Sequence, residues 1–296
     1  MNRDEVFIVL PTLQRERGEG EPFMDEDKFY HQLADRNIGL LTWDQQKRLR
    51  DSCVALFGLG GLGGVVAQII IRSGIGKIKI VDNDRFEPTN LNRQIFSYTS
   101  TLNQLKTDVT ERFLREINPD IIVEKFTVVN EESVNLMLKE SSVAVLAIDK
   151  TNPCILISRA CREKGIPLVE GWAIPFGNVR VYTKGAITLE EVYQLPTKDK
   201  SIAEIEAMDE ESFRRMDANV LMTLARIEGI EEFYRPEVVE QIITKGRLTS
   251  FAPMVWLTAV LMALEAIKVI LNWGNLALAP NFSLYDPFKQ KIPNVR

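Results

Sequence analysis

A glycine-rich turn between two apolar runs constrains this chain more than any other feature. Residues 54–57 form a short apolar run, as in a buried strand, and residues 65–73 continue as an apolar helix. Gly58, Gly60 and Gly63 have the G-x-G-x-x-G spacing of dinucleotide-binding turns. The first glycine permits the tight turn, the second lets backbone approach phosphate, and the third lets helix and strand pack closely. The spacing predicts a phosphate at the start of the helix, where free N–H groups are available.

The residues after the turn bear on which nucleotide binds. Asp82 ends the next apolar run, where a carboxylate can accept hydrogen bonds from ribose hydroxyls. Arg93 and Lys106 could offset the charge of phosphates, and Asn90 and Gln94 could add neutral hydrogen bonds. Hydride transfer needs no such cations, whereas a reaction that expels pyrophosphate builds negative charge on its leaving group. The set therefore favours ATP over a nicotinamide cofactor.

A carboxylate after a later apolar run predicts a magnesium site. Residues 143–148 form this run, and Asp149 follows it directly. The carboxyl ends of strands converge on the ligand crevice in open α/β sheets. Magnesium prefers oxygen ligands and bridges phosphates, so Asp149 is the candidate ligand for Mg²⁺.

The order of elements predicts a doubly wound, Rossmann-like α/β fold. Strand and helix patterns alternate from residue 52 to residue 169, which is typical of a mainly parallel sheet with helices on both faces. An alternating run at 178–183 predicts an antiparallel extension of that sheet. The expected organisation is an N-terminal arm and helix (1–35), an ATP-binding core (36–183), a helical insertion (184–250), and a core helix with a final strand (251–296).

The segment 184–250 differs in character from the core around it. Helical patterns occur at 201–216, 219–227 and 236–245, and the first of these is acidic. Inserted segments beside a nucleotide crevice often close over it. We therefore expect a lid or a docking surface for the substrate, with an ordinary packed insertion as the alternative.

Composition and charge narrow the class of protein. The net charge of −5 argues against a general nucleic-acid partner, which would favour a basic surface. Cys53, Cys154 and Cys161 show no paired spacing, which predicts free thiols in a cytoplasmic protein. The N-terminus has no secretory pattern. Residues 251–271 are apolar, but Glu265 and Lys268 interrupt them, so this run predicts a buried helix and no membrane span.

Taken together, these motifs resemble the ThiF/MoeB/HesA adenylyltransferases, the bacterial relatives of the ubiquitin-activating enzymes, over about residues 36–183. The resemblance implies that a carboxylate attacks the α-phosphate of ATP, giving an acyl-adenylate and pyrophosphate. It implies that Asp82 holds ribose, that Arg93 and Lys106 hold phosphates, and that Asp149 works with Mg²⁺. It also implies a homodimer in which Arg36 of one subunit reaches the ATP of the other. The candidate nucleotide-binding residues are Gly58, Gly60, Gly61, Gly63, Asp82, Asn90, Asn92, Arg93, Gln94 and Lys106.

The chain departs from the family pattern at three points. It has no Cys-x-x-Cys pair, so we expect no zinc. No cysteine follows Cys161, which leaves a covalent thioester step without its expected residue. Lys150 follows the magnesium aspartate, where asparagine is frequent in the family, and could change contacts to the ligand.

Several functions stay open at this point. The first is adenylation of the C-terminal glycine of a ubiquitin-like sulfur-carrier protein. The second is adenylation of a peptide, a small carboxylic acid or a modified tRNA base that carries a carboxylate. The third is an NAD-dependent oxidoreductase, which would leave Arg93, Lys106 and Asp149 unexplained. A fourth is a nucleotide-binding scaffold without turnover.

Overall fold

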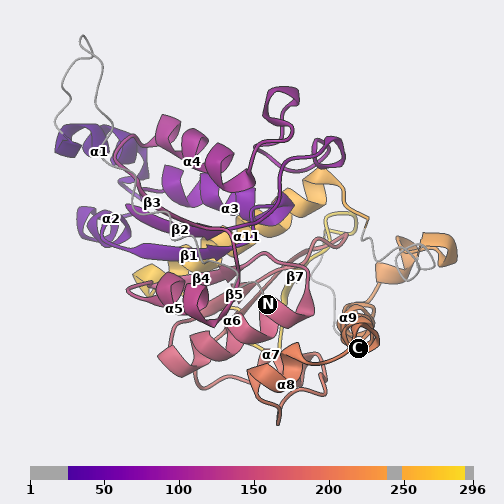
Figure 1. The fold of residues 1–296 in the computed structure, drawn as a ribbon. Helices are drawn as coiled ribbons and strands as arrows, with labels where there is room; N and C mark the ends of the chain where they lie inside the picture. The colour runs from indigo at the N-terminus through magenta and orange to yellow at the C-terminus, as the bar shows by residue number, and fades with distance from the viewer. Residues whose placement is uncertain (1–25, 239–248, 291–296) are drawn as a thin grey trace.

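A computed structural model describes residues 26–238 and 249–290 of the protein (Figure 1). The fold is built on one mixed sheet. Within these residues the sheet has seven strands in the order β3-β2-β1-β4-β5-β6-β7. Strands β3 to β5 in this order are parallel to their neighbours, and β6 and β7 add an antiparallel edge. The strands are β1 (Cys53–Phe57), β2 (Lys77–Val81), β3 (Ile122–Phe126), β4 (Val143–Leu146), β5 (Leu168–Glu170), β6 (Gly177–Tyr182) and β7 (Ser283–Tyr285). The predicted doubly wound fold with an antiparallel extension is confirmed.

The central strand β1 shows why its sequence is apolar throughout. All five of its residues are buried, because helices cover both faces of a parallel sheet. Its side chains alternate between the two faces: Val54 and Leu56 belong to the core on one side, and Ala55 and Phe57 to the core on the other. The strand therefore needs apolar residues at every position.

Helices cover the two faces of the sheet in two layers, with α3 and α4 on one side and α5 and α6 on the other (Figure 1). The first core, with Val54 and Leu56, takes in residues of α2, α3, α4 and α11, and the second takes in residues of α5, α6 and α9. These helices are α2 (Trp43–Arg50), α3 (Gly61–Arg72), α4 (Lys106–Ile117), α5 (Glu131–Leu138), α6 (Thr151–Lys164), α9 (Glu210–Leu224) and α11 (Ala252–Leu271).

Helix α11 is long and apolar enough to cross a membrane, and within the described part of the chain no other helix is. It packs against α3 and β6. Val255, Ala259 and Met262 on it are almost fully buried in the core of the protein. The predicted buried helix over 251–271 is confirmed for the face that carries these residues, whereas Trp256, Val260 and Leu264 are exposed.

The insertion contains two helices where the sequence predicted one over 201–216. Ser201 caps the short helix α8 (Ile202–Glu206), and the side chain of Asp209 accepts a hydrogen bond from the backbone N–H of Ser212 to start α9. Nothing breaks α9 before Leu224, so the separate helix predicted over 219–227 was wrong. The helix predicted over 236–245 lies mostly outside the described residues. The other elements here are α7 (Leu189–Val192) and the short 3₁₀ helix η4 (Ile230–Glu232).

The N-terminal helical pattern is interrupted before the first strand. It forms α1 (Glu26–Ala34), the 3₁₀ turn η1 (Asp35–Asn37) and α2. Thr42 accepts a hydrogen bond from the backbone N–H of Gln45 and so starts α2 as a new helix. Of the arm and helix expected over 1–35, residues 1–25 lie outside the described residues. The three cysteines are buried and free, as predicted.

Candidate functional site

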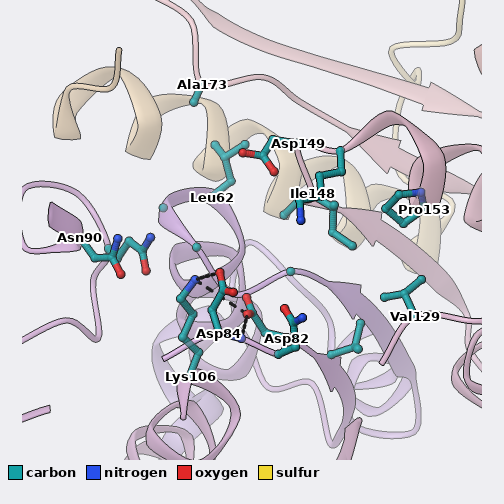
Figure 2. A pocket seen from close by; sticks show the side chains of 18 of the residues that line it. Leu62, Asp82, Asp84, Asn90, Lys106, Val129, Ile148, Asp149, Pro153 and Ala173 are labelled. Carbon is teal, nitrogen blue, oxygen red and sulfur yellow. Dashed lines mark hydrogen bonds and ion pairs between the residues drawn. The ribbon is translucent and has the colours of Figure 1, made fainter. Parts of the chain in front are cut away.

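A cavity of about 1130 Å³ lies at the carboxyl edge of the parallel strands. Ten predicted site residues line it: Gly58, Gly60, Gly61, Asp82, Asn90, Asn92, Arg93, Gln94, Lys106 and Asp149. In Figure 2, Asp82, Asp84 and Lys106 gather on one side of this cavity, and Asp149 and Ala173 lie on another. The fold therefore brings together residues that are as far apart in the sequence as Gly58 and Asp149.

The glycine turn has the geometry that its sequence predicts. Gly58 has a φ of +95°, and a Cβ on it would lie 2.5 Å from the backbone oxygen of Ala147. A Cβ on Gly63 would lie only 1.9 Å from the backbone oxygen of Gly58. Gly63 does not line the cavity, and its lack of a side chain lets α3 pack closely against the turn. Gly60 and Gly61 do line the cavity and leave their backbone open to a ligand.

Asp82 ties the end of β2 to the glycine turn. Its Oδ2 accepts a hydrogen bond of 2.8 Å from the backbone N–H of Leu59, and its Oδ1 accepts one of 2.9 Å from the N–H of Asp84. Burial raises the pKa of this carboxyl, and the nearby Lys106 ammonium and the two N–H donors oppose the rise. Asp82 thus holds the turn in place and also lines the cavity, where ribose hydroxyls could reach it.

Lys106 places a cation inside the cavity. It is the first residue of α4 and is only 5% exposed. Its Nζ lies 2.9 Å from Oδ2 of Asp84 and 3.8 Å from Oδ1 of Asp82 (Figure 2). The sequence reasoning missed Asp84. The Asp-Asn-Asp spacing at the end of β2 could have indicated it, since both acids leave the strand at the same edge.

A side-chain amide within the loop after β2 stabilises the conformation of that loop. The 3₁₀ turn η2 (Pro88–Asn90) ends in Asn90, whose Oδ1 accepts a hydrogen bond from the N–H of Glu87. Gln94 is buried, and its Oε1 has no hydrogen-bond partner among the described residues. Because an unpartnered buried polar atom is costly, Gln94 is suited to accept a hydrogen bond from a ligand in the cavity.

Arg93 lies at the rim of the cavity next to the glycine turn. Its guanidinium donates to the backbone oxygen of Thr89 at 3.0 Å and to Oδ1 of Asn92 at 2.9 Å. Asn92 in turn donates to the backbone oxygen of Ser250, which joins this loop to the segment before α11. A Cβ on Gly61 would lie 3.3 Å from Cγ of Arg93, so the glycine lets the arginine lie against the turn.

Asp149 follows β4 and lines the cavity with an exposed side chain. Within residues 26–238 and 249–290, no group of three His, Cys, Asp or Glu side chains could hold a metal ion. A lone carboxylate beside a phosphate site suits Mg²⁺, which is usually bound by one or two carboxylates together with phosphates and waters. The residue therefore fits a magnesium ion that arrives with a nucleotide.

Arg36 is the one candidate catalytic residue that the fold leaves away from the cavity. It lies in η1 with an exposed side chain and is not among the lining residues. Its proposed action on the ATP of a second subunit stays a prediction.

The sequence reasoning also missed both ends of the cavity. Asn83, Thr127, Val128 and Val129 line one end, and Trp172, Ala173, Ile202 and Glu206 are further lining residues from β5 and the insertion. Their position after strands β2, β3 and β5 was the available signal for most of them, because these strand ends face one edge of the sheet. Ile202 and Glu206 belong to α8, within the segment 184–250 that was expected beside the crevice, but no local pattern pointed to these two residues.

This fold and cavity define a nucleotide-binding α/β protein of the doubly wound class. The chain belongs to the ThiF family, whose pattern it matches over residues 34–296. The family predicted from the motifs is thereby confirmed.

Among curated proteins, the chain is similar to adenylyltransferases and activating enzymes. It is 29% identical over 274 residues to the molybdopterin-synthase adenylyltransferase of Haemophilus influenzae, covering 92% of this chain and 95% of that protein. It is 31% identical over 158 residues to the sulfur carrier protein adenylyltransferase of Thermus thermophilus, covering 53% and 57%. It is 35% identical over 127 residues to the SAMP-activating enzyme E1 of Haloferax volcanii, covering 43% and 47%. The chain thus spans about half the length of the latter two.

Solved structures share the fold. E. coli MccB with ATP has a TM-score of 0.59 at 21% identity, covering 85% of this chain and 65% of that one. PaaA has a TM-score of 0.61 at 20% identity, covering 90% and 80%. At these identities the similarity supports the architecture alone.

Proposed function

We propose that this chain is an ATP-dependent adenylyltransferase that activates a carboxylate as its acyl-adenylate and releases pyrophosphate. One observation carries the proposal: the glycine turn, the buried cation of Lys106, Trp172 and Ile202 all line a single cavity. We call the part lined by Trp172 and Ile202 the acyl end, because the carboxylate substrate would bind there. The ThiF-family relatives named adenylyltransferases support it. An NAD-dependent oxidoreductase would have no use for Lys106 and Arg93 beside the phosphates.

ATP would bind along the carboxyl edge of the sheet. The phosphates would lie at the N-terminus of α3, where backbone N–H groups favour anions. Ribose would meet Asp82 and Asp84 at the end of β2, with the base against Val129 and Ile148. Lys106 now pairs with Asp84, and its ammonium would turn toward a phosphate once the nucleotide supplies the stronger negative charge.

The reaction needs alignment and charge compensation more than proton transfer. An oxygen of the ionised carboxylate forms a bond to the α-phosphorus, and the bond from that phosphorus to the bridging oxygen breaks. The electron pair leaves with pyrophosphate, so no general base is required. Lys106 and Arg93 would offset the charge that develops on the leaving group. Asp149 would hold Mg²⁺, which supplies further positive charge beside the phosphates.

The proposal also includes the substrate, the oligomeric state and the cellular location. We infer that the most suitable substrate is the C-terminal glycine of a ubiquitin-like sulfur-carrier protein, because two relatives are named for sulfur-carrier activation. We also infer a homodimer with Arg36 reaching across it, and a cytoplasmic location. A peptide or a small carboxylic acid is the alternative substrate.

A tRNA carboxylate is the weaker alternative. A relative from Bacillus subtilis, 32% identical over 141 residues, is named tRNA threonylcarbamoyladenosine dehydratase. It supports a nucleic-acid substrate in principle, but the net charge of −5 in this chain disfavours a large nucleic-acid partner.

The test is ATP–pyrophosphate exchange with magnesium against a panel of carboxylates. The panel holds ubiquitin-like carriers that end in Gly-Gly, short peptides and small carboxylic acids. Exchange with a carrier alone supports the sulfur-carrier substrate, and exchange with a peptide or small acid moves the protein to the alternative. Absence of exchange across the panel, with ATP still bound, would contradict the proposed activity.

A further inference from the structure

Trp172 is one of the residues that line the cavity. It comes shortly after the end of β5, as Asp149 comes shortly after the end of β4, and the two strands are parallel neighbours. Because Leu146 pairs with Glu170 in the register, Asp149 and Trp172 leave the sheet from adjacent strand ends. Trp172 therefore stands next to the place where the proposed adenylation would occur.

We propose that Trp172 selects the substrate by packing against an aliphatic or aromatic side chain within its last four residues, and that a buried polar network fixes the indole ring in position. A carrier that ends in Gly-Gly would present this side chain before the two glycines. The inference rests on the proposed adenylation and adds the chemical class of the acyl group. The proposal makes no claim about the residues that bind the nucleotide.

The indole ring is held by a chain of hydrogen bonds. Its Nε1 donates to the Tyr193 hydroxyl at 2.6 Å, and that hydroxyl donates to Oε2 of Glu170 at 2.9 Å. The Tyr182 hydroxyl donates to the same oxygen at 3.0 Å and accepts from Nη1 of Arg180 at 3.1 Å. The chain thus runs from a buried guanidinium to the wall of the cavity.

The backbone of Trp172 is held as firmly as its ring. Its N–H donates to Oδ1 of Asn178 at 2.8 Å, and its carbonyl oxygen accepts from Nδ2 of the same residue at 2.7 Å. Gly171 before it has no room for a side chain, since a Cβ would lie 2.7 Å from Sδ of Met262. Both the main chain and the side chain of Trp172 are therefore restricted to one arrangement.

The network buries charged groups at a cost in folding free energy. Glu170 and Arg180 are each 2% exposed, and Oε1 of Glu170 and Nε of Arg180 have no hydrogen-bond partner among the described residues. Apolar side chains of similar volume would stabilise a core as well or better. The hydrogen bonds that the network does make still hold the Trp172 ring to Tyr193 and Glu170 in one orientation. The arrangement is best explained by the precise placement of Trp172, which a binding site requires.

Two further apolar residues of the cavity lining come from neighbouring helices. Leu156 on α6 and Ile202 on α8 line the same cavity, and α6 packs against α8. Trp172, Leu156 and Ile202 offer apolar surface to a ligand, so we expect the substrate to carry an aliphatic or aromatic side chain.

Peptides that differ at one side chain test the inference. The probes are pentapeptides of serine and glycine with a free carboxyl end, in which leucine replaces one of the last four residues in turn. Binding is measured by calorimetry with a non-hydrolysable ATP analogue, and KM for peptide and for ATP by pyrophosphate exchange. The wild-type protein should favour leucine at one position by about tenfold or more, the range for one apolar contact.

Variants distinguish the role of Trp172 in selecting the substrate from the role of the hydrogen-bond network in positioning its ring. Trp172→Ala should lose the leucine preference while KM for ATP stays unchanged, and Trp172→Phe should keep part of it. Tyr193→Phe keeps the ring but removes the hydroxyl, so it should weaken the preference through the position of Trp172. Trp273→Ala changes an exposed tryptophan outside the cavity and should leave the preference intact.

The outcomes are distinguishable. A full leucine preference in folded Trp172→Ala, or no preference at any position in the wild type, would overturn the assignment of Trp172. An unchanged preference in Tyr193→Phe would overturn the positioning role of the network. Peptide binding with the expected preference but without pyrophosphate exchange would uphold Trp172 and count against the adenylation itself.

Discussion

The carboxylate of Asp82 accepts a hydrogen bond of 2.8 Å from the backbone N–H of Leu59, so the end of the second strand holds the glycine turn after the first. Two residues 23 positions apart thus fix the position of the glycine turn at the edge of the cavity. The same carboxylate faces the cavity, which makes its ionisation matter to both stability and binding.

Asp82→Asn should change how stability depends on pH. Burial raises the pKa of Asp82 in the folded protein. A raised folded pKa means that the contribution of this group to stability is full below its unfolded pKa and is lost as pH rises through the folded value. Asparagine keeps an oxygen acceptor and cannot ionise, so the variant should gain stability relative to the wild type over that rise. Denaturant unfolding between pH 4 and 7 measures this difference, and a difference that is constant with pH would contradict it.

Loss of either phosphate cation should remove most of the activity. Lys106→Ala and Arg93→Ala should each lower pyrophosphate exchange on the order of a hundredfold or more, as for other pre-organised electrostatic groups. Lys47→Ala is a matched control, since this lysine is 73% exposed and lies outside the cavity. Wild-type exchange rates in either cavity variant would rule out the phosphate-binding roles.

Asp149→Asn should abolish the magnesium dependence of exchange and leave the fold intact. The side chain is exposed, so its replacement by a neutral amide removes a ligand without disturbing the core. A magnesium titration of exchange, together with thermal unfolding, gives both readouts. If the variant unfolds, or if its magnesium dependence matches the wild type, Asp149 has another role.

Gly63→Ala should destabilise the protein, because the new Cβ would lie 1.9 Å from the backbone oxygen of Gly58. Overpacking of this kind costs about 1–3 kcal/mol or more. Gly185→Ala is the control, since a Cβ there meets nothing within 4 Å. Urea unfolding of both variants measures the two costs, and equal stability would show that α3 can shift away from the turn.

Local sequence patterns determined the nucleotide half of this protein. The glycine spacing, the apolar runs and the acids at their ends follow rules that act within a few residues, so Gly58, Asp82 and Asp149 could be placed in advance. The same rules predicted the order of strands and helices up to β6. They failed at 201–216, where the caps at Ser201 and Asp209 divide one helical pattern into two helices.

Only the tertiary structure decided the acyl half. Nothing in the sequence links Glu170, Arg180 and Tyr193 to Trp172. The register of β5 against β6 pairs Glu170 with Arg180, and Tyr193 at the end of α7 joins Glu170 to the Trp172 ring. Ile202 reaches the cavity through the packing of α8 on α6. Such contacts join residues far apart in the chain, and no local periodicity encodes them. The physical reason is that phosphate binding depends on backbone geometry, which short motifs specify, whereas an acyl pocket depends on side chains that only the folded core brings together.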